Sequence, residues 1–525
     1  MIKEKMAQLI KKSIENLQKD KFFLKFKIPE ILVEKPEEKS RGDYAANIAL
    51  RIAKIVGKNP LEVAENLKSQ ILNLKSELFE KIEVVKPGFI NFFISKEYLQ
   101  KQVTEILKKG EKFGSLKIGK GKKVNVEFIS ANPTGPLHVG NARGGFCGDV
   151  LNNVFKKAGY KPFREYYVND VGRQRDFLEN SLYDREPSYK NPYIDVLKKK
   201  GEKDVKKAIS FILGKIKRTT EGMGINFDKW FYESDLYKKK EVNKVLNFLK
   251  KKNLIYEKEG ALWFKSTEFG DDKDRVLIRK NEKETYFLSD ITYLKNKFKR
   301  GFGYLIIFLG AEHHGYTARL RAAARALGYD PDRVKPIIMQ LVKLLEEGKE
   351  VKMSKRTGTY VSIDELLGEV GKDVSRFFFL TRSYGNHLIF DLDLAKKQSE
   401  KNPVHYIQYA HARICAILRK SGNFKAQIPK SKNFKLLDHP SELALIKELI
   451  RFSEIIEDAA KDYQVQRLPQ YAVDLATAFH QFYRDCRVIS EDKNLTQARL
   501  ALVLATKIVL KNTLDLMGIS APEKM

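Results

Sequence analysis

The sequence predicts an α/β protein of several domains, with a mostly parallel sheet at its centre, an α/β module before it and an all-α bundle after it. Strands and helices alternate through residues 124–395, as in parallel sheets with helical connections. Over residues 400–525 Gly and Pro become sparse and apolar residues recur at helical spacing, as in a helical bundle. A chain of 525 residues is long enough for about three or four domains.

Residues 1–110 have the pattern of one α/β module. A helix is expected at about residues 2–18. Pro87-Gly88 precedes a mostly apolar run that ends at Ile94, which predicts a turn followed by a strand. Residues 111–123 are rich in Gly and Lys and are expected to link the module to the central domain.

The central domain is expected to contain strands at residues 124–129, 304–309 and 334–340. The first of them leads into a helix that runs from His138 to about Ala158. A charged and largely helical insertion is expected at about residues 180–275. The central domain would therefore consist of two halves of one sheet separated by this insertion.

The charge of the chain points to a polyanionic partner. Lys and Arg number 98 against 67 Asp and Glu, which gives a formal charge of +31 at pH 7. Nucleic acid is the simplest partner for such an excess, although Lys scattered over solvated helix faces would give the same count. No apolar run approaches a membrane span, and three distant cysteines form neither a disulfide framework nor a zinc pair. We expect a cytoplasmic protein with no structural metal and no membrane partner.

Residues 127–145 are the most informative stretch, because a predicted strand ends there and a helix begins near His138. Free backbone N–H groups and the helix dipole favour an anion at such a junction. Gly140, in the first helical turn, leaves room for an adenine or ribose, whereas Gly144 and Gly148 are expected to permit close helix–sheet packing. His138 could donate to a phosphate oxygen or only cap the helix. The stretch therefore predicts a nucleotide site.

A basic loop later in the chain completes this pattern. The segment Lys352-Met353-Ser354-Lys355-Arg356 follows a predicted strand, and Ser362 with Glu365 predicts a capping box before the next helix. Lys355, supported by Lys352, could neutralise the β- and γ-phosphates of ATP in a transition state. Because a basic pentamer alone is usually a solvated loop, the prediction of ATP chemistry depends on both motifs together.

The segments His138–Asn141 and Lys352–Arg356 resemble the two ATP motifs of class I aminoacyl-tRNA synthetases. Further segments narrow the resemblance to arginyl-tRNA synthetase over essentially the whole chain: Gly42–Asn47, Pro87–Asn91, Val126–Asn132, Arg164–Asp170, Gly310–Tyr316 and Tyr406–Arg413. The resemblance implies a Rossmann-like catalytic core that joins L-arginine to tRNA-Arg, using ATP with Mg²⁺ and the 2′-hydroxyl of the terminal adenosine. It also implies an N-terminal module that grips the tRNA elbow, a helical anticodon-binding domain and a monomer.

The resemblance also implies roles for individual residues. For arginine it points to Glu127, Ser130, Asn132, His138, Tyr286 and Asp290. For ATP it points to His138, Gly140, Asn141, Lys352, Met353, Ser354 and Lys355, of which His138, Lys352 and Lys355 would be catalytic. For unstacked anticodon bases, aromatic and cationic surfaces are offered by Tyr406, Tyr409, His411 and Arg413. A carboxylate suits a guanidinium, although Asp290 could also be the N-cap of a helix.

Two residues depart from the pattern of that family. Asn141 stands where the first motif usually has a second His, so His138 would supply any imidazole role. A glutamine that contacts arginine in some members corresponds to Arg319, whose charge would repel the ligand, so this contact is not transferred.

Two other functions fit parts of the pattern. One is another class I ligase or a nucleotidylyltransferase with a related first motif, and the additional N- and C-terminal modules argue against it. The other is an inactive paralogue that only binds RNA, and the intact His138, Gly140 and Lys355 argue against that. ATP consumption with each amino acid, with and without tRNA, separates these possibilities.

Overall fold

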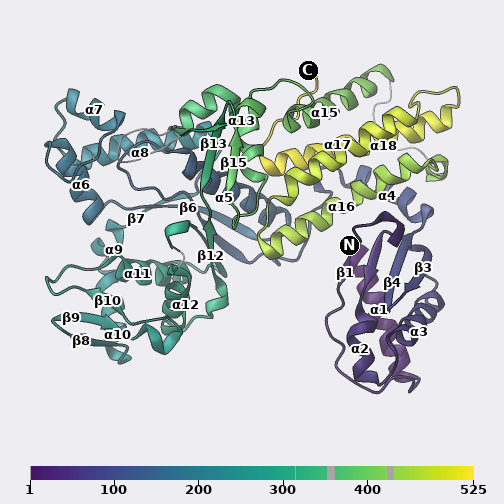
Figure 1. Ribbon diagram of the computed structural model, residues 1–525, viewed down its shortest axis with the longest axis horizontal. Coiled ribbons are helices and arrows are strands. Elements are labelled where there is room, and N and C mark those ends of the chain that lie inside the picture. The colour runs from purple at the N-terminus through teal and green to yellow at the C-terminus, as the bar shows by residue number, and fades with distance from the viewer. Residues whose placement is uncertain (1, 314, 352–360, 423–430) are drawn as a thin grey trace.

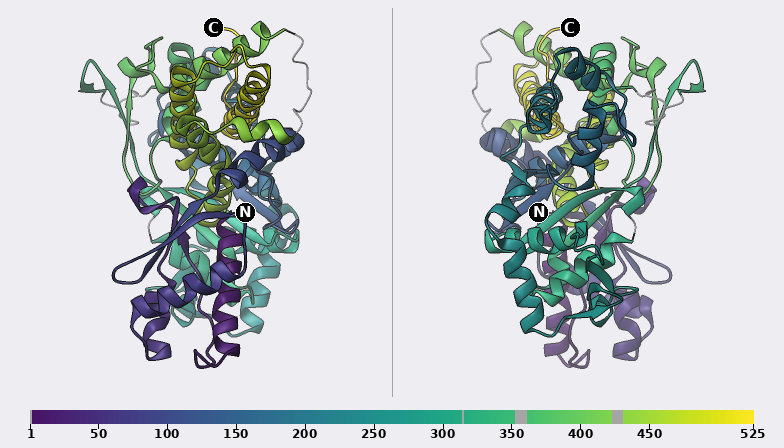
Figure 2. Two further views of the ribbon diagram at one scale, coloured as in Figure 1. Left: turned by 90° about the vertical axis from the view of Figure 1, so that its right-hand side faces the viewer. Right: turned by 90° about the vertical axis from the view of Figure 1, so that its left-hand side faces the viewer.

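A computed structural model describes residues 2–313, 315–351, 361–422 and 431–525. The chain forms an N-terminal α/β module, a central domain built on a parallel sheet, and a C-terminal helical bundle (Figure 1). The N-terminal module lies below the bundle on the right of Figure 1, and the central domain extends to the left. The side views of Figure 2 show the same arrangement, with the yellow-green bundle above the purple module. The predicted fold class is confirmed.

An antiparallel sheet and three helices make up the N-terminal module. The sheet has the order β1-β2-β4-β3, with β1 (Val33–Glu34), β2 (Tyr44–Ala46), β3 (Phe79–Val85) and β4 (Phe89–Ile94). The helices are α1 (Ile2–Lys19), α2 (Ile48–Val56) and α3 (Pro60–Asn73), followed by α4 (Lys96–Lys109). Met6, Ile10 and Ile14 recur every fourth residue on α1 and are fully buried, which is why this segment is a helix that covers the sheet.

Five parallel strands form the central sheet in the order β12-β11-β5-β6-β7. They are β5 (Lys123–Glu127), β6 (Lys161–Val168), β7 (Lys229–Tyr232), β11 (Tyr304–Gly310) and β12 (Val334–Met339). Val126 on β5 lies beside Ile306 and Arg164 of the neighbouring strands. Since the strands are parallel, their carboxyl ends meet at one edge, where ligands of such sheets bind. Helix α5 (Val139–Lys157) leaves β5 at that edge.

Two inserted segments interrupt the sheet. The first lies between β6 and β7 and contains α6 (Arg173–Leu182), α7 (Pro192–Lys199) and α8 (Val205–Gly222). The second, between β7 and β11, contains α9 (Ser234–Lys238), α10 (Glu241–Lys251), α11 (Tyr286–Lys299) and an antiparallel sheet of β8 (Ile255–Lys258), β9 (Ala261–Phe264) and β10 (Arg275–Ile278). The span expected as a largely helical insertion therefore also holds β7, a strand of the central sheet, and the strands β8 and β9.

The rest of the chain completes the central domain and the bundle. After α12 (Tyr316–Ala326) and β12 comes a small sheet of β13 (Val342–Glu346), β14 (Lys349–Glu350) and β15 (Leu388–Asp391), with α13 (Ile363–Leu380) and α14 (Leu392–Ala395). The bundle consists of α15 (Pro403–Lys420), α16 (Pro440–Asp462), α17 (Arg467–Asp485) and α18 (Lys493–Met517). Among the helices in the described ranges, none combines the length and apolarity needed to cross a bilayer.

Candidate active site

His138 is the N-cap residue of α5, as the sequence predicted for the start of this helix. Its ring nitrogen Nδ1 accepts a hydrogen bond from the Gly140 N–H at 3.1 Å. The Asn141 side-chain oxygen accepts one from the His138 N–H at 3.1 Å, so the two bonds form a capping box. This box is a physical reason for Asn at position 141. Because Nδ1 accepts, the neutral ring carries its proton on Nε2, where it is a donor.

The chain just beyond the second motif is joined to the start of α5. Residues 352–360 lie outside the described part of the chain, and so do the predicted ATP-binding residues Lys352, Met353, Ser354 and Lys355. Just beyond them, Ser362 and His138 form an antiparallel bridge. The Ile363 N–H donates to Leu137 O at 3.0 Å beside this bridge. The chain that follows the second motif therefore lies against the N-cap residue of α5, where the described chain resumes.

Ser362 also begins α13. The Glu365 N–H donates to Ser362 Oγ at 3.1 Å, and the Ser362 N–H donates to Glu365 Oε2 at 2.7 Å. This confirms the predicted capping box. The bridge between His138 and Ser362 therefore links two capped helix starts, those of α5 and α13.

The turn between β5 and α5 has an unusual backbone. Ile129 and Ser130 have positive φ angles of 66° and 41°, and a β-branched residue rarely adopts this region. Ser130 Oγ accepts a hydrogen bond from the Tyr167 N–H at 3.0 Å, which ties the turn to β6. Asn132 follows on the same turn with a partly exposed side chain. Such strain costs about 1–3 kcal/mol per residue and concentrates at functional sites.

The glycines of α5 have different environments. A Cβ on Gly148 would lie 2.4 Å from the Phe128 ring, so the predicted close packing is confirmed there. A Cβ on Gly144 would have no neighbour within 4 Å, so the same prediction is wrong for Gly144. A Cβ on Gly140 would lie 2.9 Å from the His138 ring. Gly140 therefore allows that ring to fold back over the first turn as a cap.

Buried ion pairs hold Glu127 at the carboxyl end of β5. The Lys297 ammonium, which is 1% exposed, donates to Glu127 Oε2 and lies 4.1 Å from the Tyr293 ring centroid. On the adjacent strand the fully buried Glu165 accepts two hydrogen bonds from Arg300, at 2.5 and 2.6 Å. Burial opposes the charge of Glu165, but Arg300 and Lys297 outweigh it and lower its pKa. Helix α11 is thereby locked onto β5 and β6.

Two further carboxyl groups, those of Asp290 and Glu233, form an acidic pair at the same edge. Asp290 on α11 accepts a hydrogen bond from the Tyr316 hydroxyl at 2.7 Å. Burial, with a smaller contribution from Glu127, raises the pKa of Asp290 to about 7. Burial and the charge of Asp290 also raise the pKa of Glu233 to about 7. Two acids that resist ionisation side by side favour a cationic ligand.

Glu233 was not anticipated from the sequence, although a signal for it exists. It is 3% exposed and follows β7 directly, so it stands at the carboxyl edge of the parallel sheet. The adjacent Ser234 N–H donates to Asp170 Oδ1 at 2.9 Å, which fixes this strand end against the residues after β6. Recognition of β7 as a strand would have placed Glu233 in the site.

The start of α11 decides whether Asp290 is a helix N-cap, and it shows where Tyr286 lies. Thr285 is the N-cap residue and Asp290 lies inside the helix, so the alternative that Asp290 caps it is wrong. Tyr286 is the first helical residue and is 40% exposed. Burial and the charge of Glu233 raise the pKa of Tyr286. Tyr286 therefore lies near Glu233, which in turn lies near Asp290.

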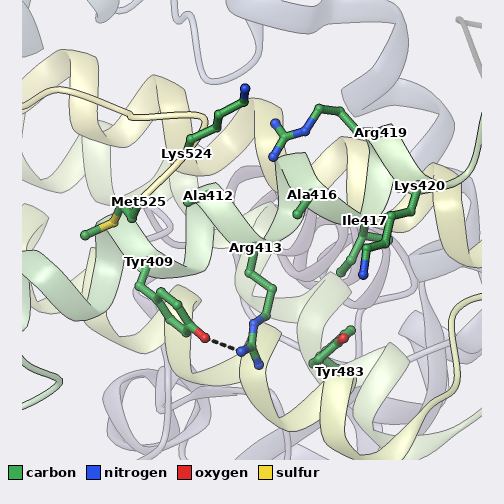
Figure 3. Close-up of a pocket in the computed structure, with 10 residues that line it drawn as sticks. All are labelled: Tyr409, Ala412, Arg413, Ala416, Ile417, Arg419, Lys420, Tyr483, Lys524 and Met525. Atoms are coloured by element: carbon green, nitrogen blue, oxygen red, sulfur yellow. Dashed lines mark hydrogen bonds between the residues drawn. The ribbon is translucent and has the colours of Figure 1, made fainter.

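A cationic pocket lies on the C-terminal bundle (Figure 3), with a volume of about 440 Å³. The Arg413 guanidinium lies 4.7 Å from the Tyr409 ring centroid and 5.2 Å from that of Tyr483. Both tyrosines are 39% exposed, and further cations line the pocket at Arg419, Lys420 and Lys524. Exposed aromatic rings among cations suit unstacked nucleic-acid bases.

Two of the four residues predicted to contact tRNA lie outside this pocket. His411 is 1% exposed, its Nδ1 lies 2.9 Å from Pro522 O, and burial lowers its pKa. A buried ring cannot stack on a base, so the structure does not support the predicted contact at His411. Tyr406 is half-buried and donates to Thr477 at 3.3 Å. Sequence spacing alone could not separate the core face of α15 from its exposed face.

Comparison with known proteins identifies the family. Residues 4–94 match the family described as arginyl tRNA synthetase N terminal domain, and residues 102–198 and 190–379 match tRNA synthetases class I (R), catalytic domain. Residues 407–525 match the DALR anticodon binding domain. The arginine–tRNA ligase of Acetivibrio thermocellus is 42% identical over 100% of this chain and 99% of its own length. The chain belongs to the arginyl-tRNA synthetase family.

Other arginyl-tRNA synthetases agree with this membership. The arginine–tRNA ligase of Shouchella clausii is 45% identical over 95% of both chains. The crystal structure of a putative arginyl-tRNA synthetase from Campylobacter jejuni is 33% identical, covers 82% of this chain and 100% of its own, and has a TM-score of 0.74. The Thermus thermophilus arginyl-tRNA synthetase shares the fold over 100% of both chains, with a TM-score of 0.82 at 23% identity.

Proposed function

We propose that this arginyl-tRNA synthetase activates arginine with ATP at the carboxyl edge of the central sheet and then transfers it to tRNA. The activity is that of an arginine–tRNA ligase, and the proposal concerns the residues that perform it. The observation that carries the proposal is the bridge between His138 and Ser362. It places Ser362, which follows the basic loop in sequence, against the N-cap residue of α5, just after the turn that follows Glu127.

The reaction consists of two displacements. The arginine carboxylate attacks the α-phosphorus of ATP, a mixed anhydride forms and pyrophosphate leaves. The 2′-hydroxyl of the terminal tRNA adenosine then attacks the activated carbonyl, and AMP leaves as the ester forms. Neither step needs a strong base, so positioning and charge stabilisation provide most of the acceleration.

The ATP subsite is assigned to the start of α5 and to the basic loop. His138 would donate from Nε2 to a phosphate oxygen, supported by the N–H groups and dipole of the helix start. Lys352 and Lys355 would neutralise the charge that develops on the leaving pyrophosphate. Gly140 and Asn141 would line the nucleotide, as would Met353 and Ser354.

The arginine subsite is assigned to the acidic pair Asp290 and Glu233. Asp290 and Glu233 would bind the guanidinium through charge-assisted hydrogen bonds, and Tyr286 would stack on it or hydrogen-bond to it. Glu127 and Asn132 would bind the α-ammonium end of arginine. The Glu127 carboxylate would then interact with both this ammonium group and Lys297. Ser130 would act by holding the turn, because its hydroxyl already accepts from β6.

Mg²⁺ would accompany the nucleotide. The first turn of α5 carries no acidic residue, and the nearby carboxylate of Glu127 is paired with Lys297. These residues do not offer the carboxylate oxygens that Mg²⁺ prefers, so phosphate oxygens and water would supply its ligands. The roles proposed above for the two displacements are therefore those of side chains of this protein.

We propose that tRNA contacts this protein at two regions. We also propose that the protein acts as a monomer in the cytoplasm. The pocket around Tyr409 and Arg413 would hold anticodon bases, and the N-terminal module would grip the elbow. Neutralisation of several phosphates by Lys and Arg predicts that tRNA affinity falls steeply as salt rises.

The variant His138→Asn tests the assignment of the ATP subsite. Asn is a good N-cap, so the variant keeps the helix start and removes the imidazole. Arginyl-adenylate formation, followed by pyrophosphate exchange in the presence of tRNA, should fall about 10²-fold with little change in tRNA affinity. His138→Ala, which also loses the cap, should in addition lower thermal stability. Normal exchange in His138→Asn would reduce His138 to a cap and contradict the assignment.

A further inference from the structure

The first turn of helix α12 carries two side chains that lie near Asp290. Tyr316 is its first residue, and Arg319 follows one turn later on the same face. The Tyr316 hydroxyl donates to Asp290 Oδ2 at 2.7 Å, and the Arg319 guanidinium lies 5.1 Å from the Tyr316 ring centroid. Tyr316 thus contacts both the carboxylate and the cation.

Arg319 is held in this place without a full set of hydrogen bonds. Its Nε is buried and has no hydrogen-bond partner among the described residues. A buried, unsatisfied guanidinium nitrogen is costly, so the position calls for an explanation beyond packing. By contrast, Arg321 on the same helix pairs with Asp332 at 2.5 Å near the surface.

The electrostatic effect of Arg319 on its neighbours has a clear direction. A cation over an aromatic ring is attracted by the ring face, and it makes the phenolic O–H a better donor. The charge of Arg319 opposes the rise in pKa that burial causes in Asp290, and it does the same for Tyr316. Both effects favour the ionised Asp290 that a guanidinium needs.

We propose that Arg319 is a positioning residue for arginine recognition, acting through Tyr316 to keep the Asp290 carboxylate charged and fixed toward the substrate guanidinium. This rests on the proposed function, in which Asp290 binds that group. Arg319 does not itself contact the guanidinium, since two like charges repel. Arg319, whose charge would repel a bound arginine in direct contact, therefore supports arginine binding indirectly, through Tyr316 and Asp290.

The pH dependence of this effect involves several groups around Asp290. They are Glu127 from β5, Tyr167 from β6, Glu233 after β7, Lys297 on α11, and Tyr316 and Arg319 on α12. Lys297 and Arg319 are the cations among these described groups that favour the ionised carboxylate. Because Lys297 is already paired with Glu127, Arg319 is the one that can be changed without breaking an ion pair.

The test compares Arg319→Gln with Arg321→Gln, which removes the same charge two residues away. In tRNA-saturated aminoacylation, the KM for arginine of Arg319→Gln should rise about three- to tenfold at pH 6.5 relative to the unchanged chain, and about twofold or less at pH 8.5. The kcat should stay within about twofold, and Arg321→Gln should match the unchanged chain at both values. Arg319→Lys, which keeps a charge, should recover part of the loss at pH 6.5.

Agmatine, which has the guanidinium and lacks the carboxylate, separates the proposal from direct binding of the substrate carboxylate by Arg319. Its inhibition constant should shift with the KM for arginine in Arg319→Gln. An unchanged constant, or a KM shift equal at both pH values, would overturn the proposal. If Arg319→Gln does not fold, Tyr316→Phe takes its place and should show the same pH-dependent loss. Lack of arginine-dependent charging by the unchanged chain would instead contradict the proposed function.

Discussion

Asp290 and Glu233 are the residues whose charge should control arginine binding. Both have a pKa raised to about 7, mainly by burial, with a smaller contribution from Glu127 for Asp290 and from Asp290 for Glu233, and only the ionised forms attract a guanidinium. The KM for arginine is therefore expected to be low near pH 8 and to rise as the pH falls through about 7. Steady-state aminoacylation between pH 6 and pH 8.5 at saturating ATP and tRNA checks this. A flat profile would show that these carboxyls do not bind the substrate.

The same two groups affect stability with the opposite sign. Their folded-state pKa lies above the unfolded value of about 4, so the free protein loses stability as the pH rises from about 4 to 7. A bound arginine cation offsets this loss. The increase in Tm on adding arginine should therefore be larger at pH 8 than at pH 6.

At the scale of single residues, sequence motifs and the family resemblance predicted some of the polar groups at this edge of the sheet and missed others. Glu127 and Asp290 were anticipated, and the structure sets both at the carboxyl edge of the sheet. Glu233 was missed because β7 reads Lys-Trp-Phe-Tyr, too short to stand out in a charged segment. His411 was misplaced because a tyrosine-rich helix does not reveal which face is buried.

Among the elements, α13 shows how one glycine shapes the site. Gly371 has φ 77° and ψ 167° in the middle of the helix, a conformation almost restricted to glycine. The half before it begins at Ser362, beside the first motif, and the half after it is tied to α18 by Arg376, which donates to Met517 O at 2.6 Å. The two halves of α13, which meet at Gly371, therefore connect the candidate site to the bundle.

The variant Gly371→Ala isolates the conformational requirement, because a Cβ there would meet nothing within 4 Å. The free energy of unfolding should fall by about 1–3 kcal/mol from backbone strain alone. Gly368→Ala is the matched control: it also has open space, lies in regular helix, and should raise that free energy by about 0.5–1 kcal/mol. Urea unfolding measures both. Equal effects of the two substitutions would show that the kink is not required.

Elements with long, regular patterns were predictable, and short ones were not. The start of α5, the strands β11 and β12 and the capping box at Ser362 follow from local sequence signals, and all are present. The β8–β10 sheet was not predicted, because its four-residue strands lie among charged residues. The start of α11 at Thr285 also rules out the alternative that Asp290 is the N-cap of a helix.

On the scale of the whole molecule, the N-terminal module is docked on the bundle by side chains of one motif. Tyr44 donates to the buried Glu454 of α16 at 2.7 Å, and Asp43 pairs with Lys447 at 2.7 Å. Burial raises the pKa of Glu454, and the hydrogen bond from Tyr44 opposes this rise by favouring the ionised carboxylate. The motif Gly42–Asn47 thus connects the two regions assigned to tRNA binding.

Tyr44→Phe is expected to loosen this docking. It leaves a buried carboxyl oxygen without its donor, at a cost of about 1–3 kcal/mol. The affinity for tRNA should fall while the KM for arginine changes little, because the central sheet is untouched. Lys35→Ala, which breaks the exposed pair with Glu448 across the same interface, is the control and should have almost no effect. Filter binding of tRNA and arginine kinetics on both variants provide the comparison.

Charging of tRNA by the purified chain, with each of the twenty amino acids in turn and with ATP, tests the central claim most directly. The acidic pair Asp290 and Glu233 predicts that arginine alone is esterified to tRNA. The resemblance to the family further predicts that pyrophosphate exchange with arginine requires tRNA. Charging with a different amino acid, or tRNA binding without any turnover, would contradict the assignment of this edge of the sheet as the site of arginine activation.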